Sequence, residues 1–249
     1  MLRSMRLGCD LDGVLADLHG AFVRTALELF PDLDRTAMAA PTVGASPPAD
    51  PGRVADVVTP AHEAAEADLA VSPRQTDAIW TRLAATEDFW EGLGEIESGA
   101  VGRLAAVVEE RRWEVLFLTS RPPAAGRTVQ RQSQRWLERH GFALPSVYVV
   151  HGSRGRIAEA LQLDVVIDDR PDNCLDVVLE SKAGAVLLWR GAPGSVPASA
   201  RRLGISVASG MTDCLETLVE AERTRDGSLV ERLRRLFGLR SGAGAILRR

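Results

Sequence analysis

Residues 10–17 of this chain are DLDGVLAD, and they follow directly on a short apolar run at positions 5–9. An apolar segment that ends in two carboxylates and a glycine predicts a buried strand whose carboxyl end opens into a polar loop. Because side chains alternate along an extended backbone, Asp10 and Asp12 begin on the same side of that strand. Two carboxylates this close repel each other unless a cation lies between them or one is protonated. Mg2+ is the cation that best suits such oxygen ligands.

Two later stretches repeat this pattern of a short apolar strand with polar residues at its carboxyl end. The run at 115–118 ends in Thr119 and Ser120, and the run at 165–167 ends in Asp168 and Asp169. In an open α/β sheet, ligands bind beyond the carboxyl ends of the strands. Strand ends that carry a carboxylate pair, a hydroxyl pair and a second carboxylate pair therefore indicate phosphoryl transfer.

The order of these motifs resembles that of the haloacid dehalogenase (HAD) superfamily of hydrolases, which carry an Asp-x-Asp strand end, a Thr or Ser strand end, a basic residue and an acidic strand end. The stretches 87–90 (EDFW), 118–122 (LTSRP) and 167–172 (IDDRPD) look like the 5′(3′)-deoxyribonucleotidase-like branch of that superfamily. The resemblance covers roughly residues 6–219. It implies an α/β fold of the Rossmann-like HAD type, with a parallel sheet, helices on both faces and a small helical cap inserted after the first strand.

The resemblance also implies a role for each residue that matches a superfamily motif. Asp10 matches the nucleophile, which attacks phosphorus to form an aspartyl phosphate, and Asp12 matches the general acid and base. Thr119 matches the residue that binds the phosphoryl oxygens. Mg2+ would be held by the Asp10 carboxylate, the Asp12 backbone carbonyl and Asp168, with Asp169 orienting the metal shell.

The chain departs from the superfamily pattern at the third motif, where a lysine is usual. Residues 151–156 are HGSRGR, and Lys182 is the only lysine in the chain. We expect Arg154 to replace the lysine, because a helical pattern continues directly after it, and Arg156 to be the fallback. Arginine keeps the positive charge and can grip phosphate with two donors, but its planar head is larger than an ammonium group.

Five positions are candidates for contact with the substrate: Ser120, Arg121, Arg156, Arg170 and Trp90. Trp90 is one of three aromatic residues in the predicted cap that could stack on a nucleobase. The alternative, which we favour for any single one of them, is that they form the cap's own small core. The three are Trp80, Phe89 and Trp90.

The pattern along the chain predicts two domains and a tail. The core domain is expected at 1–16 and 99–223, the cap at 17–98, and a basic amphipathic tail at 224–249. In the cap, we expect helices over 16–30 and from 72 onward, whereas the proline-rich stretch 39–52 should be an irregular loop. From 100 to 223 helices alternate with strands, which predicts a parallel sheet with helices on both faces.

Composition and charge restrict the classes of function. The net charge of −4 does not by itself point to a polyanion partner, and 45% hydrophobic residues suffice for a core. The three cysteines have no metal-ligand spacing, so we expect small buried apolar side chains. No apolar stretch approaches the length of a membrane span. We therefore expect a cytoplasmic protein that binds a small phosphorylated substrate, with no nucleic-acid polymer and no membrane as partner. A homodimer is left open, because the tail could pair with another copy.

Three functions remain open at this point. The first is a Mg2+-dependent phosphomonoesterase that acts on nucleoside 5′-monophosphates. The second is the same chemistry on another small phosphate, such as a sugar or glycolate phosphate. The third is a phosphate-binding regulatory module of low activity, which the missing lysine favours. Substrate choice lies in the cap, where the periodicity is weakest, so the sequence does not separate the first two.

Overall fold

The computed structural model of the chain describes residues 4–33 and 71–223. The expected loop at 39–52 and the expected tail at 224–249 lie outside the described residues. Helices and strands follow one another through the described part almost as predicted, with boundaries that differ by one or two residues.

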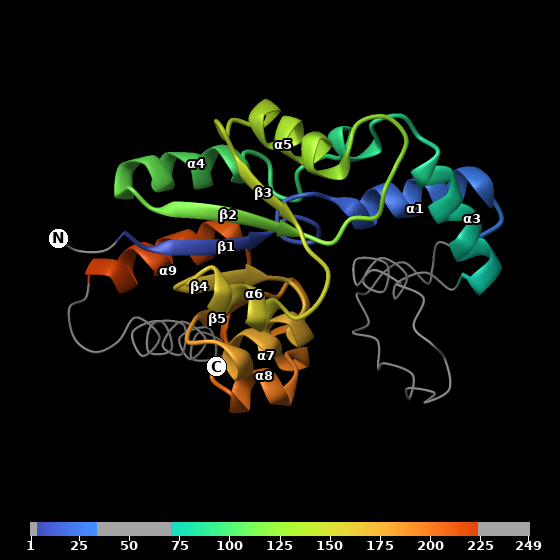
Figure 1. The fold of residues 1–249 in the computed structure, drawn as a ribbon. Helices are drawn as coiled ribbons and strands as arrows, with labels where there is room; N and C mark the ends of the chain where they lie inside the picture. Colours follow the sequence, from blue (N-terminus) through green and yellow to red (C-terminus); the bar gives the residue numbers. More distant parts are fainter. Residues whose placement is uncertain (1–3, 34–70, 224–249) are drawn as a thin grey trace.

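Six parallel strands form one sheet in the order β3-β2-β1-β4-β5-β6 (Figure 1). The chain builds the sheet outward from β1 to one edge, then returns to the other side of β1 and continues to the opposite edge. This reversal of order beside β1 creates the crevice in which doubly wound sheets bind ligands. The strands are β1 (Arg6–Asp10), β2 (Glu114–Thr119), β3 (Ser146–Val149), β4 (Val165–Asp168), β5 (Gly184–Leu188) and β6 (Ser206–Ala208).

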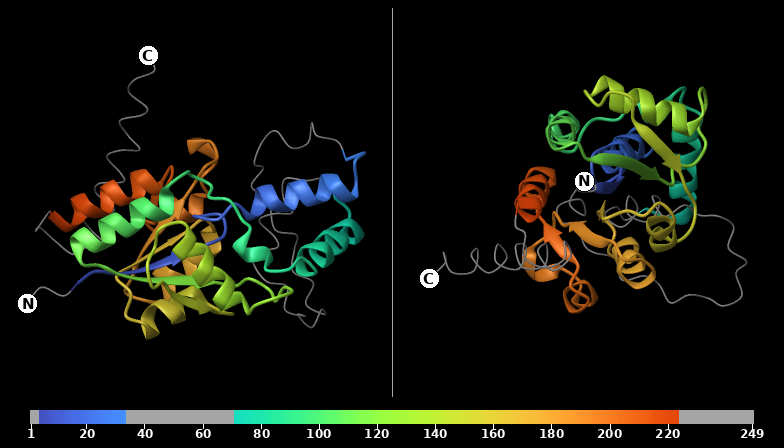
Figure 2. Two further views of the ribbon diagram at one scale, coloured as in Figure 1. Left: turned by 90° about the horizontal axis from the view of Figure 1, so that it is seen from above. Right: turned by 60° about the vertical axis from the view of Figure 1, so that its left-hand side comes forward.

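Helices cover both faces of this sheet, as predicted (Figure 2). Alternate strand residues point to opposite faces, so the sheet has a hydrophobic core on each side. Leu7, Phe117 and Ile167 belong to one core, whereas Leu116 and Val166 belong to the other. The helices are α1 (Leu18–Leu29), α3 (Pro73–Ala84), α4 (Ala100–Arg111), α5 (Val129–Arg139), α6 (Arg154–Ala160), α7 (Pro171–Glu180), α8 (Ala198–Arg202) and α9 (Met211–Arg223), with 3-10 turns η2 (Phe89–Glu91) and η3 (Pro193–Ser195).

Helices α1 and α3 project beyond the carboxyl end of the sheet and pack against each other (Figures 1 and 2). Each begins at a capping side chain. Asp17 Oδ1 accepts from the Gly20 amide at 2.8 Å, and Ser72 forms a reciprocal capping box with Gln75. The rings of Phe22 and Trp80 lie 5.4 Å apart between the two helices. Trp80 is therefore part of this small core.

The chain leaves and rejoins the sheet domain through two neighbouring segments. Ala16 pairs with Glu95 in an isolated antiparallel bridge, and the Asp17 amide donates to the Gly94 carbonyl at 2.9 Å. The pairing lies beside the predicted start of the cap at residue 17. Helix α8 was not predicted, because its five residues contain a single buried side chain, Ala200, and so carry no periodic signal.

Two other expectations concern the buried cysteines and the membrane. Cys9, Cys174 and Cys214 are all buried and free, which confirms that they act as small apolar side chains. Burial raises the pKa of each thiol, so none is an activated nucleophile. Within residues 4–33 and 71–223, the helices are too short or too polar to cross a membrane.

Candidate active site at the carboxyl ends of three strands

The central strand β1 carries Asp10 to the same edge of the sheet as the ends of its two neighbours. β1 pairs with β2 and with β4, and the register sets Asp10 beside Leu118 and Cys9 beside Ile167. The following residues on the neighbours, Thr119 and Asp168, are 1% and 0% exposed, and Asp10 is 8% exposed. The three predicted strand ends therefore meet in one buried place.

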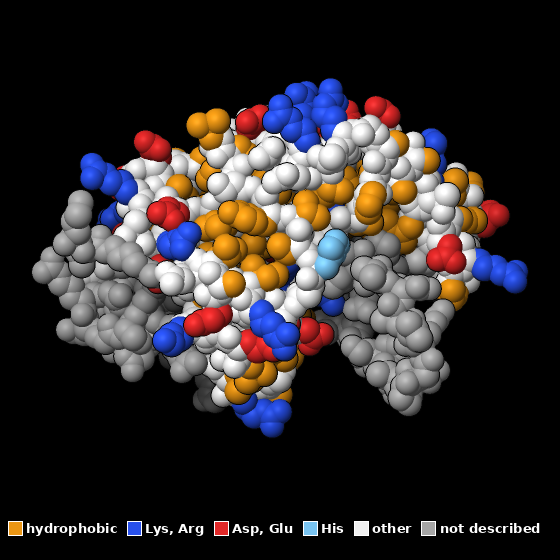
Figure 3. All heavy atoms as spheres, in the orientation of Figure 1, with side chains coloured by type: hydrophobic (Ala, Val, Ile, Leu, Met, Phe, Trp, Pro, Cys, Tyr) orange, Lys and Arg blue, Asp and Glu red, His pale blue; other side chains and the backbone are white. Residues whose placement is uncertain are grey.

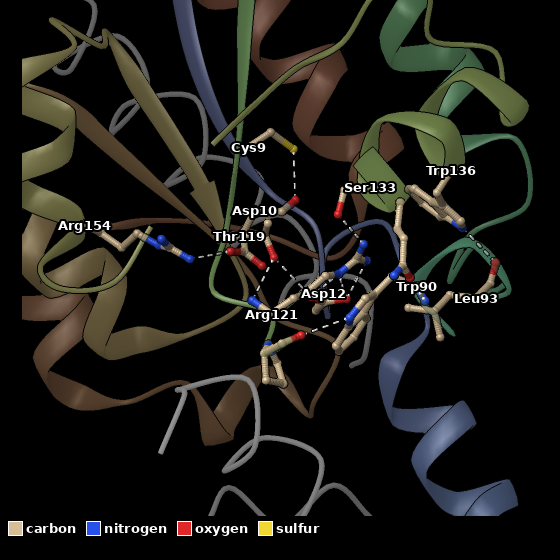
Figure 4. A network of polar contacts seen from close by, with 12 residues as sticks. Cys9, Asp10, Asp12, Trp90, Leu93, Thr119, Arg121, Ser133, Trp136 and Arg154 are labelled. Atoms are coloured by element: carbon tan, nitrogen blue, oxygen red, sulfur yellow. Dashed lines mark hydrogen bonds and ion pairs between the residues drawn. The ribbon is translucent and has the colours of Figure 1, made fainter. Parts of the chain in front are cut away.

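Arg154 lies between the carboxylates of Asp10 and Asp168. Its Nη2 donates to Asp10 Oδ1 at 2.8 Å (Figure 4), and its Nε lies 3.7 Å from Asp168 Oδ2. The latter distance is too long for a hydrogen bond. Nε is buried, and it has no hydrogen-bond partner among the described residues. This cluster thus keeps one buried donor unused beside two carboxylates.

The carboxyl groups around Arg154 have raised pKa values. Burial raises the pKa of Asp10 well above its usual range, and Asp168 raises it further, while Arg154 opposes the rise. Burial likewise raises the pKa of Asp168. The pKa of Asp169 is raised to about 7, first by burial and then by the neighbouring Asp168. Such carboxyls ionise fully when a cation joins them.

Helix α6 delivers Arg154 to this position. Ser153 caps the helix, and its hydroxyl accepts from the amides of Gly155 and Arg156 at 3.1 and 3.2 Å. Gly155 lies so close to α7 that a Cβ there would overlap the Asp176 carbonyl, so glycine permits the approach that aims Arg154 at β1. The side chain of Arg156 is 83% exposed and lies 3.7 Å from Glu180. Arg156, predicted as the fallback and as a substrate ligand, therefore points away from the site.

Asp12 makes a second, separate pair with Arg121, which follows β2. Arg121 Nε donates to Asp12 Oδ2 at 2.8 Å and to Oδ1 at 3.1 Å, and Nη2 donates to Oδ1 at 2.8 Å. The Arg121 side chain is 0% exposed and that of Asp12 is 8% exposed. Thr119 Oγ1 lies 3.5 Å from Asp12 Oδ2. Arg121 was predicted to contact substrate phosphate, but its guanidinium is occupied by Asp12 instead.

Trp90 packs against this second pair rather than facing open space. The Arg121 Cζ atom lies 4.8 Å from the centre of the Trp90 ring, and the indole Nε1–H donates to the Pro122 carbonyl at 3.1 Å. Trp90 is 1% exposed and meets Phe89 edge to face at 4.8 Å. The interpretation of Trp90 as core is the one that these contacts support. Neither face of the Trp90 ring is exposed in this structure, so the ring offers no surface on which a nucleobase could stack.

The end of β4 is fixed by groups from α7. Asn173 Nδ2 donates to both oxygens of Asp168, at 3.0 and 2.9 Å, and the Arg170 amide donates to Oδ1 at 2.9 Å. The charge of Arg170 opposes the rise in the pKa of Asp168. Asp169 packs on the loop after β1, where a Cβ at Gly13 would overlap its carboxylate. Gly13 also has a φ of +80°, which favours glycine.

Arg190 was not predicted, although it supports the loop after β1. It follows β5, and it donates to the carbonyl of Gly13 at 2.5 Å and to that of Val14 at 3.1 Å. It also pairs with Glu97 at 2.9 Å. Burial opposes ionisation of Glu97, but hydrogen bonds from the Met211 amide and Arg190 lower its pKa overall. The only sequence signal for Arg190 is its place just beyond a strand end.

The donors present at the strand ends fit the Mg2+ site that the sequence resemblance implies. No group of three or more His, Cys, Asp or Glu side chains in the described ranges is arranged to hold a metal ion. The expected site needs fewer: the carboxylates of Asp10 and Asp168 and the backbone carbonyl of Asp12. Mg2+ commonly takes one or two carboxylates and keeps several waters. The two buried carboxyls with raised pKa values suit a cation. The unused Arg154 Nε suits an anion beside it.

Comparison with known proteins gives the fold. No family model matches this sequence, and no curated protein does. A HAD family hydrolase from Deinococcus radiodurans R1, solved with bound phosphate and sodium, is similar at 20% identity and a TM-score of 0.52, over 92% of this chain and 97% of that one. A hydrolase from Pseudomonas syringae has 18% identity and a TM-score of 0.47, over 88% and 99% of the two chains. A phosphonoacetaldehyde hydrolase-like protein from Oleispira antarctica has 13% identity and 0.49, over 93% and 94%.

The first of these similarities shows that the chain has the Rossmann-like fold of HAD hydrolases. The resemblance to the deoxyribonucleotidase-like branch stays a prediction. Several of the predicted site residues are joined by the contacts given above, namely Asp10 with Arg154 and Asp168, and Asp12 with Thr119 and Arg121. Ser120 is buried next to Thr119 in the chain.

Proposed function

We propose that this protein is a phosphomonoester hydrolase that works through an aspartyl phosphate on Asp10. The observation that carries the proposal is the Asp10–Arg154–Asp168 cluster, in which a buried carboxylate meets a guanidinium with one donor still unused. A phosphoryl group brings the oxygens that such a donor needs. The HAD-type fold supports the same reading, because Asp10 stands at the central strand end where this fold binds ligands.

In the first step, an Asp10 oxygen attacks phosphorus and the bond from phosphorus to the leaving oxygen breaks. Asp12, protonated beforehand, gives its proton to that leaving oxygen. Arg154 stabilises the negative charge on the phosphoryl oxygens, and the Thr119 hydroxyl donates to one of them. Mg2+, when held by the carboxylates of Asp10 and Asp168 and the Asp12 carbonyl, would supply charge that lets the carboxylate approach an anionic phosphate.

In the second step, the Asp12 carboxylate takes a proton from water, and the water oxygen attacks phosphorus. The bond between Asp10 and phosphorus breaks and inorganic phosphate leaves. Asp10 is again a carboxylate and Asp12 is again protonated, so the cycle is balanced. The splitting of one displacement into two is the advantage of a covalent intermediate.

Nucleoside 5′-monophosphates are the first substrate class that we propose, with Mg2+ as cofactor. This finer proposal rests on the resemblance of 87–90, 118–122 and 167–172 to the deoxyribonucleotidase-like branch. Stacking on Trp80 or Trp90 does not add to it, because both side chains are buried. Phe89 is the one predicted cap aromatic that is half-buried rather than buried. Sugar and glycolate phosphates form the second class.

A phosphate-release screen with Mg2+ tests this proposal. The panel contains nucleoside monophosphates, sugar phosphates, phosphoglycolate and 4-nitrophenyl phosphate, and Asp10→Asn is measured beside the parent to exclude a contaminating phosphatase. We expect release by the parent alone, with the highest kcat/KM on a nucleoside monophosphate. A higher kcat/KM on a sugar phosphate would retire the nucleotide class only. If the parent binds phosphate but releases none from any compound, the proposed hydrolase activity is wrong and the phosphate-binding regulatory module is the function that remains.

A further inference from the structure

We propose that Arg121 is a positioning residue that holds the Asp12 carboxylate in the orientation from which it serves both proton transfers. The inference rests on the proposed function and deepens it. Arg121 contacts neither Asp10 nor Asp168 in any described hydrogen bond or ion pair, so its action on the chemistry passes through Asp12.

The contacts between the two side chains fix both Asp12 oxygens. Nε and Nη2 of Arg121 together make three contacts of 2.8 to 3.1 Å with the carboxylate. A paired contact of this kind sets the plane of the carboxylate as well as its distance. Asp12 stands in the loop after β1, where Gly13 already has a φ of +80°. Without a partner, the Asp12 side chain could rotate away from the strand ends.

The same contacts leave one oxygen with capacity for a proton. Asp12 Oδ1 accepts from both Nε and Nη2 of Arg121. Oδ2 accepts one short bond from Nε and lies 3.5 Å from Thr119 Oγ1. Oδ2 therefore faces the residue that we assign to the phosphoryl oxygens, and it is the oxygen that we expect to exchange the proton.

Arg121 is itself held from two other elements (Figure 4). Its Nη1 donates to Ser133 Oγ on α5 at 2.9 Å, and its guanidinium lies against the Trp90 ring in η2. The Trp90 amide donates to Gln132 Oε1 at 3.0 Å, so η2 and α5 are joined directly. A guanidinium that is fixed on three sides can impose its geometry on Asp12, whereas a flexible one could not.

The test compares two kinds of substrate. An alkyl phosphate needs a proton on its leaving oxygen, whereas 4-nitrophenyl phosphate releases a stable anion that does not. The variants are Arg121→Met, Arg121→Lys, Asp12→Asn and the double variant Asp12→Asn/Arg121→Met. The matched control is Arg135→Met, because Arg135 also joins α5 to a carboxylate of η2, that of Glu91 at 2.8 Å. Figure 3 shows the basic side chains that gather over α5.

We expect Arg121→Met to lower kcat/KM for the alkyl phosphate about a hundredfold and for 4-nitrophenyl phosphate only a few-fold. Its kcat should fall for both substrates, because water activation also needs Asp12. Samples quenched in acid during turnover of 4-nitrophenyl phosphate should then contain more phosphorylated protein than the parent. Asp12→Asn should show the same pattern, and the double variant should be no worse than Asp12→Asn. Arg121→Lys should lie between parent and Arg121→Met.

Several results would overturn the inference. Equal losses for both substrates, without accumulation of phosphorylated protein, would make Arg121 a structural residue only. A gain in rate on substitution would mean that Arg121 restrains Asp12. Should Arg121→Met fail to fold, the same two-substrate comparison is made with Arg121→Lys and with the double variant. The double variant leaves no unpaired buried carboxylate. An inactive parent would defeat the proposed function, whereas an active parent with unaffected Arg121 variants would defeat this inference alone.

Discussion

Two aspartates that stand two residues apart each meet a buried arginine, yet the two pairs are built differently. Around Asp12, the guanidinium of Arg121 bonds to both carboxylate oxygens and to Ser133 and lies on Trp90. Around Asp10, Arg154 makes one short bond and keeps Nε without a partner among the described residues.

The difference indicates which pair awaits a ligand. A buried donor without a partner and carboxyls with raised pKa values are unfavourable in the folded protein, and a bound phosphoryl group with a cation would relieve both. The Asp12 pair has no such deficit. We therefore propose that the Asp10 pair binds phosphate and forms the covalent bond, and that Asp12 transfers protons while Arg121 orients its carboxylate.

The largest expected effect is on turnover in Asp10→Asn. Asparagine has nearly the same shape but cannot form an aspartyl phosphate, so kcat should fall on the order of a thousandfold or more. The melting temperature should not fall, because the substitution removes a carboxyl that burial and Asp168 make unfavourable. Steady-state phosphate release and thermal unfolding measure the two. Turnover within a few-fold of the parent would remove Asp10 from the nucleophile position.

The next effect separates two arginines that are two residues apart on α6. Arg154→Ala should lower kcat about a hundredfold or more, because the charge that faces the phosphoryl group is lost. Arg156→Ala is the matched control and should stay within about twofold, since its side chain is 83% exposed. Arg154→Lys should retain activity if charge is what matters. Equal effects of the two alanine variants would contradict the placement of the third motif.

A stability measurement distinguishes the Asp12 pair from the Asp10 pair. Arg121→Met leaves the buried Asp12 carboxylate unpaired and should lower the free energy of unfolding by about 3 kcal/mol or more. Adding Asp12→Asn should recover a large part of that loss. Chemical denaturation of the two variants and the parent gives the values. If Arg121→Met were as stable as the parent, the buried Asp12 carboxylate would not depend on Arg121 as its ion-pair partner.

The smallest effect is a pH dependence of stability. The carboxyls of Asp10, Asp168 and Asp169 have folded-state pKa values above their unfolded values, that of Asp169 being about 7. As pH rises from about 4 towards 7, the unfolded chain loses these protons first, so the folded state binds more protons and its stability falls. The melting temperature without metal should therefore decrease over this range.

Two comparisons isolate that contribution. Asp168→Asn should flatten the decrease, whereas Glu110→Gln, a change at a side chain that is 69% exposed, should not. Mg2+ added at neutral pH should raise the melting temperature of the parent more than that of Asp168→Asn. The melting temperature of the parent could instead rise from pH 4 to 7 and lose that rise in Asp168→Asn. That result would contradict a raised pKa for Asp168 in the folded protein.

The sequence predicted the strand ends because their signals are local. A short apolar run followed by carboxylates or hydroxyls is visible without knowledge of the fold, and this pattern located Asp10, Thr119 and Asp168. Arg154 was predicted because a helical pattern follows the third strand, and its side chain does lie against Asp10. Each of these residues needs only its own segment to be recognised.

The partners of Arg121 and Trp90 were not predictable in the same way. Arg121 was assigned to phosphate, but its contacts with Asp12 and Ser133 join positions 109 and 12 residues away along the chain. Trp90 and Arg190 likewise act through contacts that depend on how η2 and β5 pack. A sequence pattern gives the residue type at such positions, but only the packing decides which carboxylate or carbonyl it meets.

The most direct test of the division between the two aspartates is to locate the phosphoryl group during turnover. The protein is mixed with 4-nitrophenyl phosphate and Mg2+, quenched in acid and reduced with borohydride, which converts a phosphorylated aspartate to homoserine, and the peptides are then analysed by mass spectrometry. We predict conversion at Asp10 and none at Asp12. Conversion at Asp12, or turnover without conversion at either residue, would contradict the account.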